Sequence, residues 1–506
     1  MENLRRGEFV YEQPAFPETE YTFKHALTQE VAYNSVLAER RQTLHQRAGE
    51  AIEALYAEHI EDHLDGLAHH YGRSADVGKA VNYLYLAARQ CSERTADPQA
   101  LTYLNQGLEL VGTLPEGSDR FRLERALQTA KGRSLYVSQG WGAPETGRAY
   151  QRARELCLRF GDNTQLFSVL WGLRLFHRWR LELRTSREME NQLVSIAEEP
   201  NDPAMKLNAH GALGTTLLWI GELVAAREHF EQATNTGGAI LNSLRVSTND
   251  YDQMAVSLSL SAWTVALLGF LDRGINLADQ ALAWAQGQSR PLTYGLALMY
   301  VSLLDQFRGD VPAAQEHSAA ARAIAAEYRH LHIDAIAAVI EGWARSCRGE
   351  VESGIDEMLY GIAGAKATGL RPPTFLIVPL IEVYIRLGRS EEADRLLADA
   401  LETAHETNQR LHVAELYRLR GEVLLRPSRN ESEAESCFRE AIGIARAQSA
   451  KWWELRATMS LARLLAEQDR RDEARAMLAD IYNWFTEGFD TADLKEAKAL
   501  LDELGA

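Results

Sequence analysis

Small residues recur at a nearly constant interval along the second half of this 506-residue chain. Each one follows a short turn and precedes another small or apolar residue seven positions later. The recurring positions are Ala226, Gly274, Ala314, Gly354, Ala393, Ala434 and Ala474, at spacings of 48, 40, 40, 39, 41 and 40 residues. A period of this kind indicates an array of similar units, each of which buries one face against the next.

The clearest copy of the repeat shows what one unit is. Leu213-Gly214 lies in a first apolar segment, Gly221 in a turn, and Ala226 and Phe230 in a second segment. This is the tetratricopeptide pattern, in which small residues let two helices approach and a large ring fills the space between them. The period exceeds the usual value of about 34 residues, so longer helices or turns must absorb the difference. We therefore expect an all-α fold, a tetratricopeptide-like helix-turn-helix solenoid wound as a right-handed superhelix.

The repeat is regular only over part of the chain, which predicts a domain order. We expect a remnant of winged-helix and linker helices over 1–58, a first repeat pair over 59–115, irregular helical repeats over 116–200, regular repeats over 201–488 and a capping helix over 489–506. The last segment carries an apolar face formed by Leu494, Ala497, Leu500, Leu501 and Leu504. A solenoid needs a terminal helix of this kind, with one polar face, to end its core.

Composition excludes several classes of function. The net charge is −17, from 71 acidic and 54 basic residues, whereas nucleic-acid binding depends on Lys and Arg that neutralise phosphates. The longest apolar run, 375–385, is too short to cross a bilayer. The cysteines Cys91, Cys157, Cys347 and Cys437 lie far apart and form no CxxC pair, which fits a reducing compartment. We expect a cytoplasmic protein that binds neither nucleic acid nor membrane.

No motif in the chain indicates catalysis. The nearest approach to a phosphate-binding loop, from Gly72 to Ala80, has one residue too many and Ala in place of Ser or Thr. His59 and His63 are four residues apart, near His69 and His70, but they lack the HExxH order of a zinc helix. We therefore expect no enzyme activity, no catalytic residues, no cofactor and no metal site.

Aromatic residues recur at two positions of the repeat that tend to face the concave groove of a tetratricopeptide array. They are Trp179, Trp219, Trp263, Phe307 and Trp343. Equivalent positions stack along a solenoid axis, so these rings are expected to line one continuous, partly exposed inner surface. Such a surface would bind a protein or peptide segment or a small effector. The alternative is that the rings pack between helices, as Trp and Phe most often do.

Both ends of the chain resemble a known family. The segment from Tyr21 to Tyr33, YTFKHALTQEVAY, and the residues that follow it through Glu53 resemble the stretch that closes the winged-helix part of bacterial STAND-type signalling ATPases. The tail from Trp484 to Leu494, WFTEGFDTADL, is similar to the end of those proteins that join a class III adenylate or guanylate cyclase domain, an AAA-type ATPase and a C-terminal tetratricopeptide array. This chain begins after the catalytic domains of that arrangement, so the resemblance implies the sensor or scaffold half alone.

Two functions follow as hypotheses. The first is a non-catalytic binding, scaffold or effector-sensing module that holds a protein segment or small ligand in its concave groove. The alternative is the regulatory part of a nucleotide cyclase or ATPase signalling protein, with catalysis supplied by domains outside this chain. A purely structural spacer is a third class, and solvent-exposed rings in the groove would favour binding over it.

Overall fold

The computed structural model describes residues 2–7, 9–13, 20–94, 96–140, 142–160, 163–198, 202–237, 252–288, 290–367, 370–426 and 430–505. The chain divides into two compact units. The first unit comprises Met1–Ser138 and Arg148–Phe160, and the second comprises Gln139–Gly147 and Gly161–Ala506.

The first unit is helical apart from one small hairpin. Its strands pair antiparallel with Val10 opposite Phe23, and they are the only strands in the described part of the chain. The elements, including a short 3₁₀ helix η1, are α1 (Glu2–Arg6), β1 (Val10–Gln13), β2 (Glu20–Phe23), α2 (Ala26–Ser35), α3 (Ala38–Leu55), η1 (Ile60–His63), α4 (Leu64–Tyr71), α5 (Val77–Glu93), α6 (Asp97–Thr113), α7 (Ser118–Gln139) and α8 (Pro144–Phe160), whose first residues belong to the second unit.

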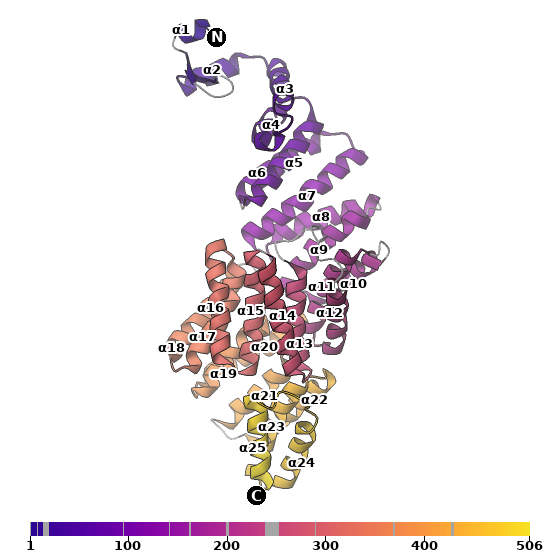
Figure 1. The fold of residues 1–506 in the computed structure, drawn as a ribbon, viewed down its shortest axis with the longest axis vertical. Helices are drawn as coiled ribbons and strands as arrows, with labels where there is room; N and C mark the ends of the chain where they lie inside the picture. The colour runs from indigo at the N-terminus through magenta and orange to yellow at the C-terminus, as the bar shows by residue number, and fades with distance from the viewer. Residues whose placement is uncertain are drawn as a thin grey trace. The chain divides into compact units, whose positions relative to one another are not determined.

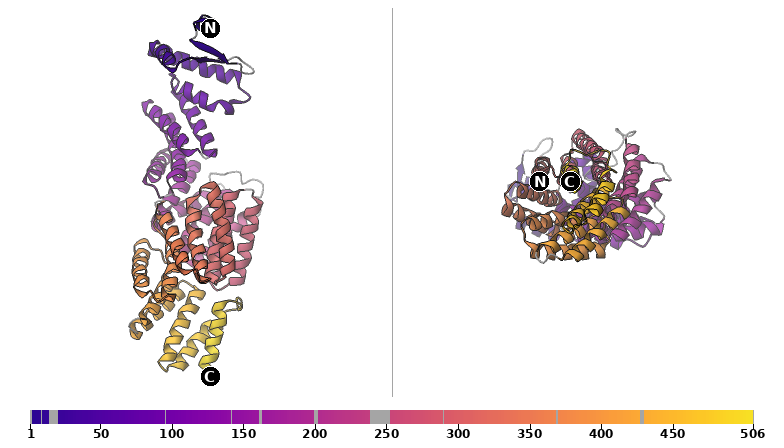
Figure 2. Two further views of the ribbon diagram at one scale, coloured as in Figure 1. Left: turned by 90° about the vertical axis from the view of Figure 1, so that its left-hand side faces the viewer. Right: turned by 90° about the horizontal axis from the view of Figure 1, so that it is seen from below.

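The second unit is an array of helix pairs (Figures 1 and 2). Its helices are α9 (Asn163–Trp179), α10 (Leu183–Glu198), α11 (Pro203–Trp219), α12 (Leu223–Gly237), α13 (Gln253–Leu267), α14 (Leu271–Gly287), α15 (Pro291–Arg308), α16 (Val311–Tyr328), α17 (Leu331–Cys347), α18 (Val351–Ala367), α19 (Thr374–Arg386), α20 (Ser390–Thr407), α21 (Val413–Leu425), α22 (Glu431–Ala447), α23 (Lys451–Glu467), α24 (Arg471–Tyr482) and α25 (Ala492–Gly505). The expected all-α solenoid of helix-turn-helix units is thereby confirmed.

Local signals in the sequence explain where these helices begin and end. Asp202 and Asp252 cap α11 and α13 with side chains that accept backbone N–H groups of the first turn, as N-cap carboxylates do. Gly221 follows α11 with a φ of 80°, and Gly309 ends α15 with a φ of 76°. Only glycine adopts this left-handed conformation without steric cost, so it terminates the first helix and starts the turn into the second.

The repeat phase predicted from the small residues is correct. All seven recurring positions lie in the second helix of a pair, and all are buried. Ala226 on α12 is 0% exposed, and a Cβ atom at Gly214 on α11 would lie 2.9 Å from the ring of Phe230. The two helices therefore approach closely at Gly214 and Ala226, and the Phe230 ring fills the remaining space between them.

The array curves until later helices contact earlier ones. The backbone N–H of Arg410 donates to the carbonyl oxygen of Trp219 at 3.0 Å, which joins the segment before α21 to the end of α11. The Arg456 guanidinium on α23 donates to the carbonyl oxygen of Phe307 at 2.6 Å. First helices of pairs separated by about four repeats thus face each other across the inside of the superhelix.

The C-terminal helix α25 covers the last pair with an apolar face. Leu494, Ala497, Leu500 and Leu504 are buried, whereas Leu501 is only half-buried. The predicted face is therefore correct except at Leu501, which lies at its edge. Among the described helices, none is both long enough and apolar enough to span a lipid bilayer.

Candidate functional site

The five aromatic residues predicted to line an open groove are buried. Their exposed fractions lie between 3% and 7%, for Trp179, Trp219, Trp263, Phe307 and Trp343. All five do lie on first helices of successive pairs, α9, α11, α13, α15 and α17, as the repeat register predicted. The expectation that they are partly exposed is wrong.

The cause of this burial is the curvature of the array. The Trp219 ring stacks on Phe375 of α19 at 4.9 Å between centroids, and the Trp263 ring lies 5.7 Å from His412, which directly precedes α21. The Phe307 ring contacts Trp453 of α23 edge-on at 5.1 Å. Side chains of later repeats therefore occupy the concave face of the earlier ones, and most of the groove is filled by the chain itself.

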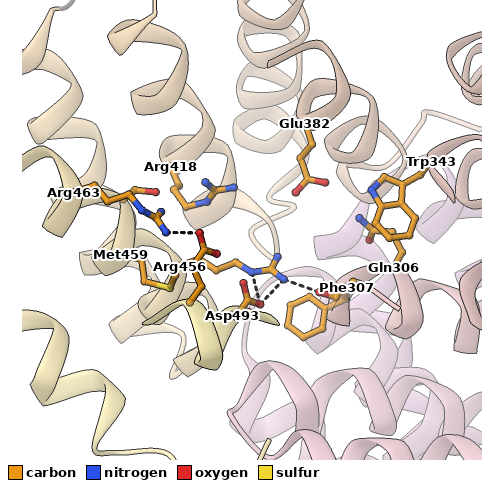
Figure 3. Close-up of a pocket in the computed structure, with 12 residues that line it drawn as sticks. Gln306, Phe307, Trp343, Glu382, Arg418, Arg456, Met459, Arg463 and Asp493 are labelled. Atoms are coloured by element: carbon orange, nitrogen blue, oxygen red, sulfur yellow. Dashed lines mark hydrogen bonds and ion pairs between the residues drawn. The ribbon is translucent and has the colours of Figure 1, made fainter. Parts of the chain in front are cut away.

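Part of the inner surface stays open as a chamber of about 240 Å³ (Figure 3). It is enclosed by the first helices α15, α17, α19, α21 and α23 together with α25. The lining residues are Gln306, Phe307, Gly309, Trp343, Glu382, Arg418, Arg456, Met459, Ser460, Arg463, Asp493 and Glu496. Of the predicted groove residues, the chamber brings together Phe307 and Trp343, whereas Trp179, Trp219 and Trp263 do not line it.

Each arginine that lines the chamber already has a carboxylate partner. The Arg418 Nε donates to Glu415 at 2.9 Å, and Glu415 is only 1% exposed. The Arg463 guanidinium donates to Glu496 at 2.6 Å. These cations are therefore neutralised by the protein, and they offer little unbalanced positive charge to a ligand.

The third arginine is the centre of a network that ties three helices together. Arg456 donates through Nε and Nη2 to Asp493 of α25 at 3.0 and 2.8 Å, in addition to its bond to the Phe307 carbonyl oxygen. The Trp452 indole N–H donates to the same Asp493 oxygen at 2.6 Å. Because Arg456 stabilises the ionised carboxyl, the pKa of Asp493 stays below its ordinary value despite burial.

Glu382 is the lining carboxylate without such a partner. Among the described residues its side chain forms no hydrogen bond or ion pair, although it points into the chamber (Figure 3). Burial, and next the neighbouring charge of Glu415, raise the pKa of Glu382 to about 7, while Arg456 and Arg418 act in the opposite direction. Glu382 is thus a carboxyl whose charged form an additional nearby cation would stabilise.

The repeat register of the sequence places Glu382 at a groove position, although the search for aromatic residues overlooked it. Trp343 precedes the small residue Gly354 by eleven positions, and Glu382 precedes Ala393 by the same eleven. The two residues therefore occupy equivalent positions in consecutive repeats. Arg418, Arg456 and Asp493 were also missed. The contact of Arg456 with Phe307 crosses about four repeats and depends on superhelix curvature, which the sequence pattern does not specify.

Comparisons with known proteins define what the chain is similar to. No protein-family model matches it. It is 25% identical over 466 residues to an uncharacterized protein of Rhizobium meliloti (strain 1021), a match that covers 88% of this chain and 43% of the relative. This chain therefore spans less than half the length of the curated relative that it matches.

One solved structure supports the fold. A Rap protein complexed with competence and sporulation factor superposes with a TM-score of 0.54 at 11% identity, covering 73% of this chain and 98% of that one. The human IFIT1 dimer with m7Gppp-AAAA matches more distantly, with a TM-score of 0.43 at 12% identity over 80% of this chain and 90% of that one. The first match supports a helical-repeat fold of the tetratricopeptide type, and at this identity it supports the fold alone.

Proposed function

We propose that this chain is a non-catalytic binding module whose inner chamber holds a basic side chain of a protein or peptide segment. One observation carries the proposal: the three arginines of the chamber are each paired with a carboxylate, whereas Glu382 is not. Glu382 is half-buried, and a carboxylate that is partly removed from water without a partner is destabilised. A cation from outside the chain would relieve that cost.

The aromatic wall supports a cationic ligand as well. Trp343 lines the same chamber as Glu382, and so does Phe307, whose ring already faces the Arg456 guanidinium at 5.1 Å. Aromatic faces attract guanidinium and ammonium groups, and the attraction grows when water is excluded. A basic side chain that enters here can therefore pair with the carboxylate and contact an aromatic ring at the same time. The net charge of −17 favours the approach of basic segments at longer range.

The size of the chamber limits the ligand. Pockets for drug-sized molecules have volumes of about 300–1,000 Å³, and this chamber has about 240 Å³. It can hold one long side chain and the backbone next to it, but not a folded partner. The rest of a bound segment would lie outside the chamber.

A peptide array tests this function. The tag-free full chain is incubated with immobilised short peptides in which Arg, Lys, norleucine or Glu occupies each position in turn. The proposal expects retention of peptides that carry Arg or Lys, and at least a tenfold loss of affinity, about 1.4 kcal/mol, when Glu382→Gln replaces the wild type. Glu391→Gln is the matched control, because it removes an exposed carboxylate of α20 that does not line the chamber. Equal retention of norleucine peptides would contradict the proposal.

A regulatory role within a longer signalling protein is the second candidate. The observation that favours it is the relative in which the matched region makes up only 43% of the length. In that arrangement the module would sense a segment and an attached ATPase or cyclase would respond. Fusing the chain to the remainder of the relative, and measuring nucleotide turnover with and without a retained peptide, tests this candidate. Turnover that does not change with the peptide would contradict it.

A further inference from the structure

Three histidines of the first unit converge where α3 packs against α4. His45 comes from α3, and His69 and His70 come from α4. One ring nitrogen from each can be chosen so that all three lie within 4.8 Å of one another. His45 is buried, His70 is half-buried and His69 is exposed, so the cluster is anchored in the protein and opens to solvent on one side.

This cluster differs from the histidine pair that the sequence spacing brings to attention. His59 precedes the 3₁₀ helix η1 and His63 ends it, so the two do not share an α-helix face. The His63 ring instead stacks on Tyr56 at 3.8 Å between centroids. The residue that completes the cluster, His45, lies 24 positions before His69, and only the packing of α3 on α4 brings it close.

A rigid framework holds the two helices at this separation. A Cβ atom at Gly49, one turn beyond His45, would lie 2.7 Å from the Tyr71 ring, so the helices touch there. One turn further along α3, Glu53 accepts hydrogen bonds from the hydroxyls of Tyr71 and Tyr83 at 2.7 and 2.6 Å, and from the Lys79 ammonium at 2.7 Å. These contacts fix the backbone that carries the three imidazoles.

One distance within the cluster is close to that between imidazole nitrogens bound to the same ion. The Nδ1 atoms of His45 and His70 are 3.0 Å apart. Two nitrogens bound to the same tetrahedral zinc ion, each at about 2.0–2.1 Å, are about 3.3 Å apart. The Nε2 of His45 lies 3.0 Å from the Tyr33 hydroxyl, which is the kind of outer hydrogen bond that orients a metal-binding imidazole.

The surroundings of the cluster favour the neutral form of the three imidazoles. Burial, followed by the charges of neighbouring histidines and Arg73, lowers the pKa of His45. Burial and Arg73 likewise lower the pKa of His69 and His70. Neutral imidazole is the form that ligates a metal ion.

We propose that His45, His69 and His70 form a binding site for a divalent transition-metal ion of the type that prefers imidazole, zinc foremost. Three histidine ligands leave a fourth tetrahedral position for water on the solvent side. The described residues of this region include no cysteine beside the cluster, and the set of three nitrogens favours Zn²⁺ over Mg²⁺ or Ca²⁺, which prefer oxygen.

Arg73 occupies a hydrogen-bonding position on His69 that metal binding would require it to leave, and this competition can be tested directly. Its Nη1 donates to Nδ1 of His69 at 3.0 Å and to the carbonyl oxygen of the same residue at 3.1 Å. If His69 binds the metal through Nδ1, the Arg73 guanidinium must move away from that atom. If His69 binds through Nε2, Nδ1 of the neutral ring carries the proton, and Arg73 can no longer donate a hydrogen bond to it. In either case metal binding breaks the side-chain bond, and the positive charges of Arg73 and Arg41 repel the ion as well.

The test uses the tag-free full chain and Co²⁺ or Zn²⁺ alone. Titration with Co²⁺, followed by its visible absorption bands, and with Zn²⁺, followed by calorimetry, is expected to give one equivalent bound. His69→Gln and His70→Gln should each weaken binding by at least about tenfold. His59→Gln, an exposed histidine of the same unit outside the cluster, is the matched control and should bind as the wild type does. Arg73→Met should bind more tightly than the wild type.

Circular dichroism of each variant distinguishes loss of the metal site from loss of folding. His69 is exposed and His70 is half-buried, so we expect their variants to fold. Saturable binding that the His69 and His70 variants lose and the Arg73 variant strengthens supports the site. Binding that is equal in all variants would mean an adventitious ion only, and no binding to the folded wild type would overturn the proposal. Unchanged affinity in Arg73→Met would contradict the competition between the guanidinium and the metal.

Discussion

Trp343 and Glu382 occupy the same position of consecutive repeats, and both line one chamber inside the superhelix. The ring forms part of the wall, and the Glu382 carboxyl is the lining carboxyl that no chamber arginine pairs with directly. The same repeat position therefore holds an aromatic ring in one unit and an ionisable carboxyl in the next. The predictions below follow from this arrangement and from the contacts that enclose it.

Glu382 makes the stability of the second unit depend on pH. Its pKa is raised to about 7 in the folded protein, against an ordinary value of 4.5. The contribution of the protonated carboxyl is complete below about pH 4.5 and is lost as the pH rises through 7. The free energy of unfolding of the wild type, relative to Glu382→Gln, should therefore fall by about 2.5 kcal/mol between these values. Urea titrations across this range measure it, and parallel curves for the two proteins would contradict it.

Close packing of α11 against α12 leaves no room for a larger side chain at Ala226. Ala226 is 0% exposed beside Gly214 and Phe230, so Ala226→Leu should destabilise the protein by about 1–3 kcal/mol through overpacking. Ala319→Leu, on an exposed position of α16, is the control and should change the melting temperature little. A wild-type melting curve for Ala226→Leu would mean that the repeat phase is wrong.

Trp263 should contribute to stability rather than to ligand contact. It is 3% exposed and lies 6.1 Å from Trp219 and 6.3 Å from Phe375 between ring centroids. Trp263→Ala should therefore cost about 3–5 kcal/mol of stability through the cavity that it leaves. Thermal unfolding checks this cost. A variant that keeps wild-type stability but loses peptide binding would restore the original interpretation of this ring as part of an open surface.

Arg456 should be needed to keep the superhelix closed. Arg456→Met leaves the Asp493 side chain, which is 19% exposed, with only the Trp452 N–H as a donor. A fully buried uncompensated charge costs about 3–5 kcal/mol, so the half-buried Asp493 should cost less, about 1–3 kcal/mol. The double variant Arg456→Met/Asp493→Asn removes both charges and should recover most of the loss. Chemical denaturation of the three proteins measures the effect. Equal destabilisation of the single and double variants would show that the ion pair is not the cause.

The fold was predictable from the sequence because the repeat is a local pattern. The positions of Ala226 and its equivalents fix which segments pair, and Gly221 and Gly309 mark where first helices end. The first-helix location of Trp343 and Phe307 follows from the same register. Each of these features depends on residues within about one repeat of each other.

The site was only partly predictable because it depends on contacts between distant repeats. Arg456 reaches the carbonyl oxygen of Phe307, 149 positions earlier in the chain. The number of repeats per turn decides whether such groups meet, and a small rotation at each pair decides that number. A pattern of residue types does not specify this rotation, so it could not show that later helices would cover Trp219 and Trp263 while leaving a chamber at Trp343.

A double-mutant cycle between Glu382 and the basic residue of a bound peptide tests the central claim most directly. A peptide retained on the array is compared with its Arg-to-norleucine analogue, by calorimetry, on the wild type and on Glu382→Gln. The account predicts that norleucine costs at least about tenfold in affinity on the wild type, 1.4 kcal/mol, and almost nothing on Glu382→Gln, because the two changes remove the same interaction. An equal cost on both proteins would place the basic residue elsewhere and contradict the account.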